Sequence, residues 1–160
     1  MDFKEKLLEY FHLNESDFNE LSKPLDEIKL LDPNSIESMS KIKDRIFKAI
    51  QNNEKIIVYG DYDCDGVSAT TIVVKTFEKL NYKVSYYLPI RYSDGYGLNV
   101  KNVIKIKEAG FSLIITVDNG IAQDEAIKKA NELGMDVIVV DHHEAPEVPV
   151  PAYAVIHPIV

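Results

Sequence analysis

Cysteine and long apolar runs are what this 160-residue sequence has least of. The single cysteine, Cys64, excludes an internal disulfide and any zinc site built from several cysteines, and it suits a reducing compartment. No apolar run approaches the roughly 20 residues that span a bilayer, and the charged amino terminus lacks a signal-peptide core. We therefore expect a cytoplasmic protein without a membrane partner, in which any metal is held by oxygen and imidazole.

Basic residues are fewer than acidic residues. The chain has 18 Lys and Arg against 26 Asp and Glu, which gives a formal net charge of -8. Binding of nucleic acid through bulk electrostatics needs clustered cations, so this balance argues against it. A metal-dependent enzyme that acts on phosphates remains compatible, because divalent ions change the local sign of the charge.

The first 50 residues contain no glycine and show helical spacing. We expect helices over residues 3–11 and 35–51, with Ser35 as the cap of the second helix after a turn at Pro33. One face of that helix carries Ile36, Met39, Ile42, Ile46, Phe47 and Ile50. Residues 1–52 are interpreted as a helical segment packed on the main domain. A partner-binding arm is the alternative, and no residue supports it.

From Lys55 onward, short β-branched runs alternate with helical segments. The runs predict strands at residues 55–60, 83–89, 112–120, 135–143 and 152–157. Helices are expected at residues 68–80, 100–110 and 122–134. Strands rich in Ile and Val on both faces, separated by helices, are typical of a parallel sheet that is covered on both sides. Residues 53–160 are thus predicted to form an α/β, Rossmann-like domain.

Acidic residues and histidines follow three of these strands, where parallel sheets bind their ligands. The three groups are Asp61, Asp63 and Asp65; Asp118, Asn119 and Gly120; and Asp141, His142 and His143. Each motif alone is weak, because acidic turns are common, but their shared edge predicts a polynuclear metal site. Because we expect the chain to bend at Gly66, two ligands from the first group are favoured over three.

The expected chemistry follows from the charge of this edge. Several carboxylates that converge within a few ångströms cannot all stay ionised without cations, and carboxylate with imidazole suits Mn²⁺, or Mg²⁺. Two such ions about 3.5 to 4 Å apart clamp the oxygens of an in-line phosphoryl displacement. A two-metal phosphodiesterase is therefore the predicted reaction type.

The sequence also resembles a known family. The stretches VYGDYDCDGVSATTI, VDNGI and VVDHHEAP resemble the first three motifs of the DHH phosphoesterases, and LPIRYSDGYGLN is similar to a segment of the RecJ branch. The resemblance covers about residues 55–158. It implies a 5′ to 3′ exonuclease of recombination and repair that uses two Mn²⁺ or Mg²⁺ ions and releases 5′-mononucleotides. The implied partners are single-stranded DNA, a helicase and a single-strand-binding protein.

The same resemblance implies roles for single residues. The metal ligands are Asp63, Asp65, Asp118 and His142, with Asp118 between the two ions, while Asp61 and Asp141 orient the ligands. His143 completes the catalytic set, facing the scissile phosphate or supporting a ligand. The substrate contacts are Arg91 as a fork for phosphate, Tyr96 as a stacking surface, Gly95 and Gly97 as sites of close backbone approach, and Asn119 and Gly120 as a phosphate cradle.

Some positions depart from the family pattern. Tyr59 stands where relatives often place a histidine ligand, and His157 stands where an asparagine is expected. Cys64 is interpreted as a small packed side chain. A further aspartate motif and a glycine-rich nucleic-acid-binding domain are expected in the family but are missing before Val160. The chain is therefore interpreted as an amino-terminal fragment with weak or no activity of its own.

Two other functions stay open. One is a DHH phosphodiesterase that acts on short oligoribonucleotides or cyclic dinucleotides. The other is a catalytically silent module that binds metal or nucleotide.

Overall fold

The computed structural model describes residues 2–24 and 32–158, with the side chains of residues 93 and 94 left aside. The chain divides into two compact units, Met1–Pro33 and Asn34–Val160. This division falls before the boundary expected at residue 52, because the helix that precedes the first strand packs on the sheet. Among the described residues, no helix is both long and apolar enough to span a bilayer.

The first unit holds two short helices, α1 (Phe3–Tyr10) and α2 (Glu15–Leu21). Each begins with a reciprocal capping box, in which the side chains of the cap and of the third helical residue each accept a backbone N–H of the other. The residue pairs are Asp2 with Glu5 and Asn14 with Asp17. The helix α2 was not predicted, although the Asn14 and Asp17 spacing is a recognisable start signal.

The second unit is built on a five-stranded parallel sheet in the order β2-β1-β3-β4-β5. The strands are β1 (Lys55–Tyr59), β2 (Ser85–Tyr87), β3 (Phe111–Val117), β4 (Asp136–Val140) and β5 (Ala154–Ile156). The strands β1, β3 and β4 start within one residue of the predicted runs, and β2 and β5 start two residues later than predicted, which confirms the predicted α/β fold with a parallel sheet. The outer strands β2 and β5 are shorter than predicted, with three residues each.

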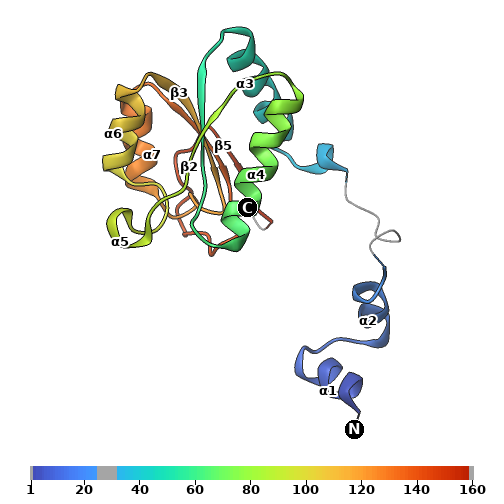
Figure 1. Cartoon of the computed structure of the whole chain (residues 1–160). Coiled ribbons are helices and arrows are strands. Elements are labelled where there is room, and N and C mark those ends of the chain that lie inside the picture. Colours follow the sequence, from blue (N-terminus) through green and yellow to red (C-terminus); the bar gives the residue numbers. More distant parts are fainter. Residues whose placement is uncertain (1, 25–31, 159–160) are drawn as a thin grey trace. The chain divides into compact units, whose positions relative to one another are not determined.

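Helices cover both faces of the sheet (Figure 1). On one side lie α3 (Met39–Gln51) and α4 (Cys64–Lys79); on the other lie α6 (Val100–Glu108) and α7 (Asp124–Glu132). A one-turn helix, α5 (Arg91–Asp94), precedes α6. The strand β3 shows why its sequence is apolar without alternation: Leu113 and Ile115 pack under α3 and α4, whereas Ile114 packs toward α6 and α7.

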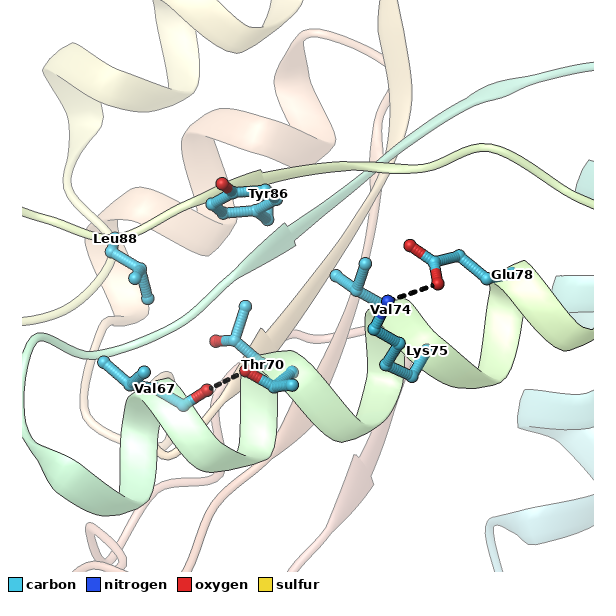
Figure 2. Close-up of a pocket in the computed structure, with 8 residues that line it drawn as sticks. Val67, Thr70, Val74, Lys75, Glu78, Tyr86 and Leu88 are labelled. Carbon is cyan, nitrogen blue, oxygen red and sulfur yellow. Dashed lines mark hydrogen bonds and ion pairs between the residues drawn. The ribbon is translucent and has the colours of Figure 1, made fainter.

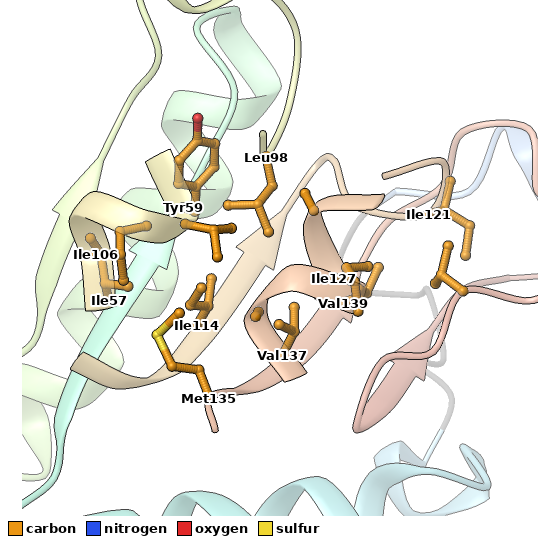
Figure 3. Packing of buried hydrophobic residues seen from close by; sticks show 14 residues of the cluster. Ile57, Tyr59, Leu98, Ile106, Ile114, Ile121, Ile127, Met135, Val137 and Val139 are labelled. Carbon is orange, nitrogen blue, oxygen red and sulfur yellow. The ribbon is translucent and has the colours of Figure 1, made fainter. Parts of the chain in front are cut away.

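The core facing α6 and α7 is shown in Figure 3, where Ile57, Ile114, Val137 and Ile127 interdigitate between sheet and helices. Full burial of an Ile or Val side chain contributes about 1.5–3 kcal/mol. Side chains pack in this way on both faces of the sheet, so the loops that follow the strands start from a well-packed edge.

The start of α3 differs from the prediction. Residues Pro33–Ser35 form the short 3₁₀ helix η2, and α3 begins only at Met39. The expected cap at Ser35 is therefore wrong. The neighbouring Ser38 donates its hydroxyl to the carbonyl oxygen of Val155 in β5 (2.6 Å), so this side chain ties the helix start to the sheet edge instead of capping α3.

A cluster of three charged residues ties α3 to the start of the strand β4. The Arg45 guanidinium donates to Glu54 (2.7 Å) and to Asp136 (2.5 Å), and Ser112 donates to the same Glu54 carboxylate (2.6 Å). Arg45 is buried, so both carboxylates are needed to offset the desolvation of its charge. The contact with Asp136, which lies 91 residues from Arg45 in sequence, fixes α3 to β4.

Candidate metal centre

The carboxyl ends of β1, β3 and β4 deliver the acidic and histidine side chains to one edge of the sheet. Asp61 and Asp63 follow β1, Asp118 follows β3, and Asp141, His142 and His143 follow β4. A hollow of about 290 Å³ opens there, lined by Asp65, Ala69, Asp118, Val140, Asp141, His142 and Ile156. The structure thus brings together the three predicted groups.

The turn from β1 into α4 is tighter than predicted. The helix begins at Cys64, and Asp63 is its cap, since its carboxylate accepts the backbone N–H of Gly66 (3.1 Å). Gly66 lies in the first turn rather than at a bend, and a Cβ there would come within 2.7 Å of Asp61. A side chain at residue 66 would therefore push α4 away from Asp61. Cys64 is exposed, so the prediction of a packed side chain is wrong.

Asp118 is the most constrained acid of the edge. Its backbone adopts the left-handed conformation (φ 61°), which is uncommon for any residue except glycine, although aspartate tolerates it better than most. The side chain is buried, and its Oδ1 lies 2.9 Å from His142 Nε2. Its Oδ2 is buried and finds no hydrogen-bond partner among the described residues. A buried carboxylate oxygen without a partner is what a bound cation would satisfy.

Two groups of side chains have a geometry that suits metal binding, and Asp118 belongs to both. In Asp61, Asp63 and Asp118, one ligand atom from each residue lies within 4.8 Å of the others, and the same holds for Asp118, His142 and His143. Oxygen and imidazole donors of this kind suit Mn²⁺ or Mg²⁺. The donor set and the unsatisfied Oδ2 therefore fit the predicted metal.

Asp65 and Asp61 differ in burial and in their distances to the other side chains of the edge. Asp65 sits in the first turn of α4, belongs to neither group of three, and keeps 67% of its side chain exposed, with Oδ2 3.9 Å from His142 Nε2. Asp61 is buried and belongs to the first group, although an orienting role was predicted for it. Asp61 thus meets the ligand-atom distances of the first group, while Asp65 lines the hollow beside His142.

The pKa directions follow from burial and like charge. Burial raises the pKa of Asp61, and the negative charge of Asp63 adds to the rise. Burial likewise raises the pKa of Asp118, with the charge of Asp65 as the next cause. The hydrogen bond from the Gly66 N–H lowers the pKa of Asp63. The edge therefore holds more negative charge than its surroundings stabilise, which a cation would correct.

Asp141 and His143 form a separate hydrogen-bonded pair. Asp141 accepts the backbone N–H groups of Ile121 (2.9 Å) and His142 (2.7 Å), and its Oδ1 lies 2.7 Å from His143 Nδ1. Burial alone would raise the pKa of Asp141, but these hydrogen bonds hold it below its ordinary value. The same contact with Asp141 raises the pKa of His143. His157 contacts the carbonyl oxygen of His143 through Nε2 (2.7 Å), which supports the loop that carries both histidines.

The segment after β2 contributes two of the predicted substrate residues. The Tyr96 hydroxyl lies 3.1 Å from His143 Nδ1 and donates to the carbonyl oxygen of Asp118 (3.4 Å), so it faces the centre. Arg91 is exposed and lies over the ring of Tyr62, 5.6 Å from the ring centre. Tyr62 was not singled out from the sequence, although it stands between two of the aspartates. Gly95 is exposed at φ 77°, with open space around it.

Other predicted contacts face the protein interior. Gly97 is buried against Gln123. The Gly120 N–H already donates to Gln123 Oε1 (2.8 Å). Asn119 is fully buried, and its carboxamide is engaged by backbone groups. Tyr59 is also fully buried, stacked on Tyr87, and it belongs to neither metal group. Among these residues the structure leaves no phosphate cradle open at Asn119 or Gly120.

A second hollow, of about 340 Å³, lies between α4 and the edge strand β2 (Figure 2). Its walls are largely apolar, with Val67, Val74, Tyr86 and Leu88 drawn around it. It contains none of the acidic or histidine residues of the centre. The chemistry therefore belongs to the smaller hollow at the strand ends.

A parallel α/β domain with carboxylates and imidazoles at its strand ends defines a class of metal-binding domains. The chain belongs to the DHH family: the profile described as "DHH family, N-terminal domain" matches residues 55–160. The chain is 50% identical over 128 residues to the single-stranded-DNA-specific exonuclease RecJ of Bacillus subtilis, covering 79% of this chain and 16% of that protein.

Solved structures show the same relationship. The crystal structure of an exonuclease RecJ bound to manganese superposes with a TM-score of 0.74 at 32% identity, covering 83% of this chain and 33% of the other. The RecJ of Thermus thermophilus in complex with Mn²⁺ gives a TM-score of 0.71 at 29% identity, covering 95% and 21%. The chain thus spans between about a sixth and a third of the length of these relatives.

Proposed function

We propose that this chain forms the amino-terminal part of the catalytic centre of a two-metal phosphodiesterase, a RecJ-type exonuclease that acts on single-stranded DNA. The observation that carries the proposal is the shared Asp118, which belongs to both groups of potential ligands. A carboxylate shared by two ligand groups supports two neighbouring ions. The relatives named as single-stranded-DNA-specific exonucleases, and the two solved with manganese, support the choice of substrate and of Mn²⁺, or Mg²⁺, as the cofactor.

The proposed ligands are Asp61, Asp63, Asp118 and His142, with Asp65 at the rim of the same hollow. Divalent ions bound there would supply the positive charge that polarises a phosphate and activates water. Asp63 is held in place by its hydrogen bond with the start of α4, and Asp118 by its buried turn. The residues of this chain would therefore hold their carboxylate oxygens in the orientation that the ions require.

Although His143 also belongs to the second ligand group, we take Asp118 and His142 as the ligands of that group and assign His143 to proton transfer. Asp141 accepts from Nδ1 and favours the protonated ring, which leaves Nε2, beside the Tyr96 hydroxyl, for a phosphate oxygen. Arg91, over the Tyr62 ring, offers a planar fork for a terminal phosphate, and the exposed ring surface of Tyr96 offers a stacking platform for a base. The 5′ to 3′ direction, the release of 5′-mononucleotides, the cytoplasmic location and recruitment by a helicase and a single-strand-binding protein are parts of the proposal that rest on the resemblance.

A chimera tests the function without depending on the activity of the chain alone. In it, this chain replaces the matching segment of the Bacillus subtilis relative. We expect the chimera with Mn²⁺ to hydrolyse 5′-phosphorylated single-stranded DNA to mononucleotides, and we expect Asp63→Asn and Asp118→Asn chimeras to be inactive. A folded chimera without hydrolysis, or one that both substitutions leave active, would refute the proposal. Preference for dinucleotides over long DNA would favour the oligonucleotide phosphodiesterase instead.

A further inference from the structure

Behind the metal centre lies a buried polar network of Tyr59, Asn102 and Asn119, and the proposed function does not use it. All three side chains are buried. Asn102 Nδ2 donates to the Tyr59 hydroxyl (2.9 Å), and that hydroxyl donates to the carbonyl oxygen of Gly97 (3.2 Å). Figure 3 shows the Tyr59 hydroxyl pointing away from the apolar side chains beneath its ring. The hydroxyl therefore links β1 to the segment that carries Tyr96.

Asn119 extends this link to a third segment. Its Nδ2 donates to the carbonyl oxygens of Tyr59 (3.1 Å) and Val117 (3.0 Å), and its Oδ1 accepts the N–H of Leu98 (3.3 Å). One carboxamide thus joins the end of β1, the end of β3 and the segment after Tyr96. Both of its N–H groups are used, so the orientation of the amide is specified by its surroundings.

The residue before Asn119 is the one that most needs such support. Asp118 holds a left-handed backbone conformation, which persists only where neighbouring contacts specify it. On one side the Asp118 N–H donates to the carbonyl oxygen of Val140 (2.9 Å). On the other side, the buried Asn119 carboxamide forms hydrogen bonds with backbone groups of three residues, Tyr59, Leu98 and Val117. The direction of the Asp118 carboxylate therefore depends on both flanks of the turn.

The same network places Tyr96 against the centre. Tyr96 stands directly before Gly97, whose carbonyl accepts from Tyr59, and two residues before Leu98, whose N–H is held by Asn119. Its hydroxyl contacts the carbonyl oxygen of Asp118 and the ring of His143. The spacing between the Asp118 carboxylate and the Tyr96 hydroxyl is therefore set by groups that touch neither metal nor substrate.

We propose that Asn119 is a positioning residue of the metal centre: its buried carboxamide holds the Asp118 carboxylate and the Tyr96 hydroxyl at the spacing that the bound ions and the substrate require. This role replaces the phosphate contact expected from the sequence. The inference rests on the proposed function, because it takes Asp118 as a metal ligand. Tyr59 and Asn102 support the same arrangement from the side of β1.

The first test measures Mn²⁺ affinity of the 160-residue chain by calorimetry. We expect Asn119→Ala to raise the Mn²⁺ dissociation constant about tenfold or more, the range seen when residues that orient metal ligands are removed. The matched control is Ile127→Val, a buried truncation in α7 that costs stability without touching the network. It should bind Mn²⁺ as the wild type does. Asn119→Ser, a smaller change, takes the place of the alanine variant if that variant does not fold.

The second readout separates positioning from general loss of stability. The chain has four histidines, so the imidazole signals are few enough to assign by NMR. The Tyr96 ring stands edge-on to the His143 ring, with centres 5.6 Å apart and planes at 76°. We expect Asn119→Ser and Tyr59→Phe to shift the His143 signals and to leave those of His12 unchanged. The Ile127→Val control should leave both sets of signals unchanged.

The outcomes distinguish the two proposals. If the wild-type chain binds no Mn²⁺, this inference is overturned for the isolated chain, whereas the proposed function is decided by the chimera. If the wild type binds and a folded Asn119→Ala binds equally well with unchanged His143 signals, only the positioning role is overturned. Weakened binding with shifted His143 signals, absent in the Ile127→Val control, supports it.

Discussion

Replacing Asp118 with asparagine should stabilise the metal-free protein and destabilise the metal-bound protein relative to wild type. Asp118 Oδ2 is buried without a partner among the described residues, and burial and the charge of Asp65 raise the pKa of Asp118. An acid whose pKa is higher in the folded than in the unfolded state costs stability once the pH exceeds its unfolded value. At neutral pH without metal, the asparagine removes that cost. Its Oδ1 still accepts from His142, and its Nδ2 can donate to the neighbouring carboxylates.

The magnitude follows from the distances. Ligand oxygens of Asp61, Asp63 and Asp118 lie within 4.8 Å of one another. Repulsion of two unit charges at that distance is about 0.9 kcal/mol at the dielectric constant of water and about 3.5 kcal/mol at an effective value near 20. Asp63 is exposed and screened, whereas Asp61 is buried. We therefore expect a gain of about 1–2 kcal/mol, or about 3–6 °C in Tm, for Asp118→Asn in EDTA.

Thermal unfolding followed by circular dichroism, in EDTA and in Mn²⁺, checks this expectation. Mn²⁺ at about a hundred times its dissociation constant should stabilise the wild type by about 2.7 kcal/mol and reverse the order of the two proteins. Asp124→Asn is the control, because Asp124 is an exposed carboxylate of α7 paired with Lys128 (2.7 Å), outside the centre. A less stable Asp118→Asn in EDTA would refute the argument from like charge. Equal stabilisation of both proteins by Mn²⁺ would refute Asp118 as a ligand.

Three further results follow from the structure. Asp61→Asn should weaken Mn²⁺ binding in calorimetry about tenfold or more, and Asp65→Asn should weaken it much less. If Asp65→Asn has the larger effect, Asp65 is the ligand, as the resemblance implied, and Asp61 is not. Arg45→Ala should destabilise the fold by about 3 kcal/mol in urea unfolding, since it leaves two carboxylates without their partner; a loss below about 1 kcal/mol would mean that the pair contributes little. Asp141 raises the pKa of His143, so the stability from this contact is present below the unfolded pKa of histidine and is lost as the pH rises through the raised folded pKa. Asp141→Asn should therefore lower the pKa of His143 in an NMR titration. An unchanged titration would contradict the assigned contact.

The layers of the fold could be predicted because the sequence repeats one signal. The strands β1, β3 and β4 are runs rich in Ile and Val, and the helices between them have a helical period, so these strands and the helices α6 and α7 lie close to their expected places. The start of α3 could not be predicted, since Ser35 and Ser38 are both good caps locally. Neither side chain caps α3, because Ser35 lies in η2 and Ser38 donates to Val155 in β5, far away in sequence.

The candidate site could also be predicted only in part, because the positions of single side chains depend on contacts that the sequence does not show. That acids and histidines share one edge follows from parallel topology alone. Which of Asp61, Asp63 and Asp65 points into that edge does not, because it depends on where α4 begins. An extended chain would have placed all three alike, but the helix starts at Cys64, so Asp65 lies in its first turn and lines the hollow with 67% of its side chain exposed. The role of Asn119 could not be predicted for a related reason, since a polar residue beside a proposed ligand can hold the turn as well as contact the substrate, and here its carboxamide binds backbone groups.

The shared position of Asp118 has a topological cause. In the order β2-β1-β3-β4-β5, strand β3 is flanked by β1 on one side and by β4 on the other. The loop after β1 carries Asp61 and Asp63, and the loop after β4 carries His142 and His143. A residue at the end of β3 lies between both loops, so it is the one that can belong to both ligand groups. The left-handed turn at Asp118 therefore lies at the strand end between both groups, and the buried Asn119 directly follows it in the chain.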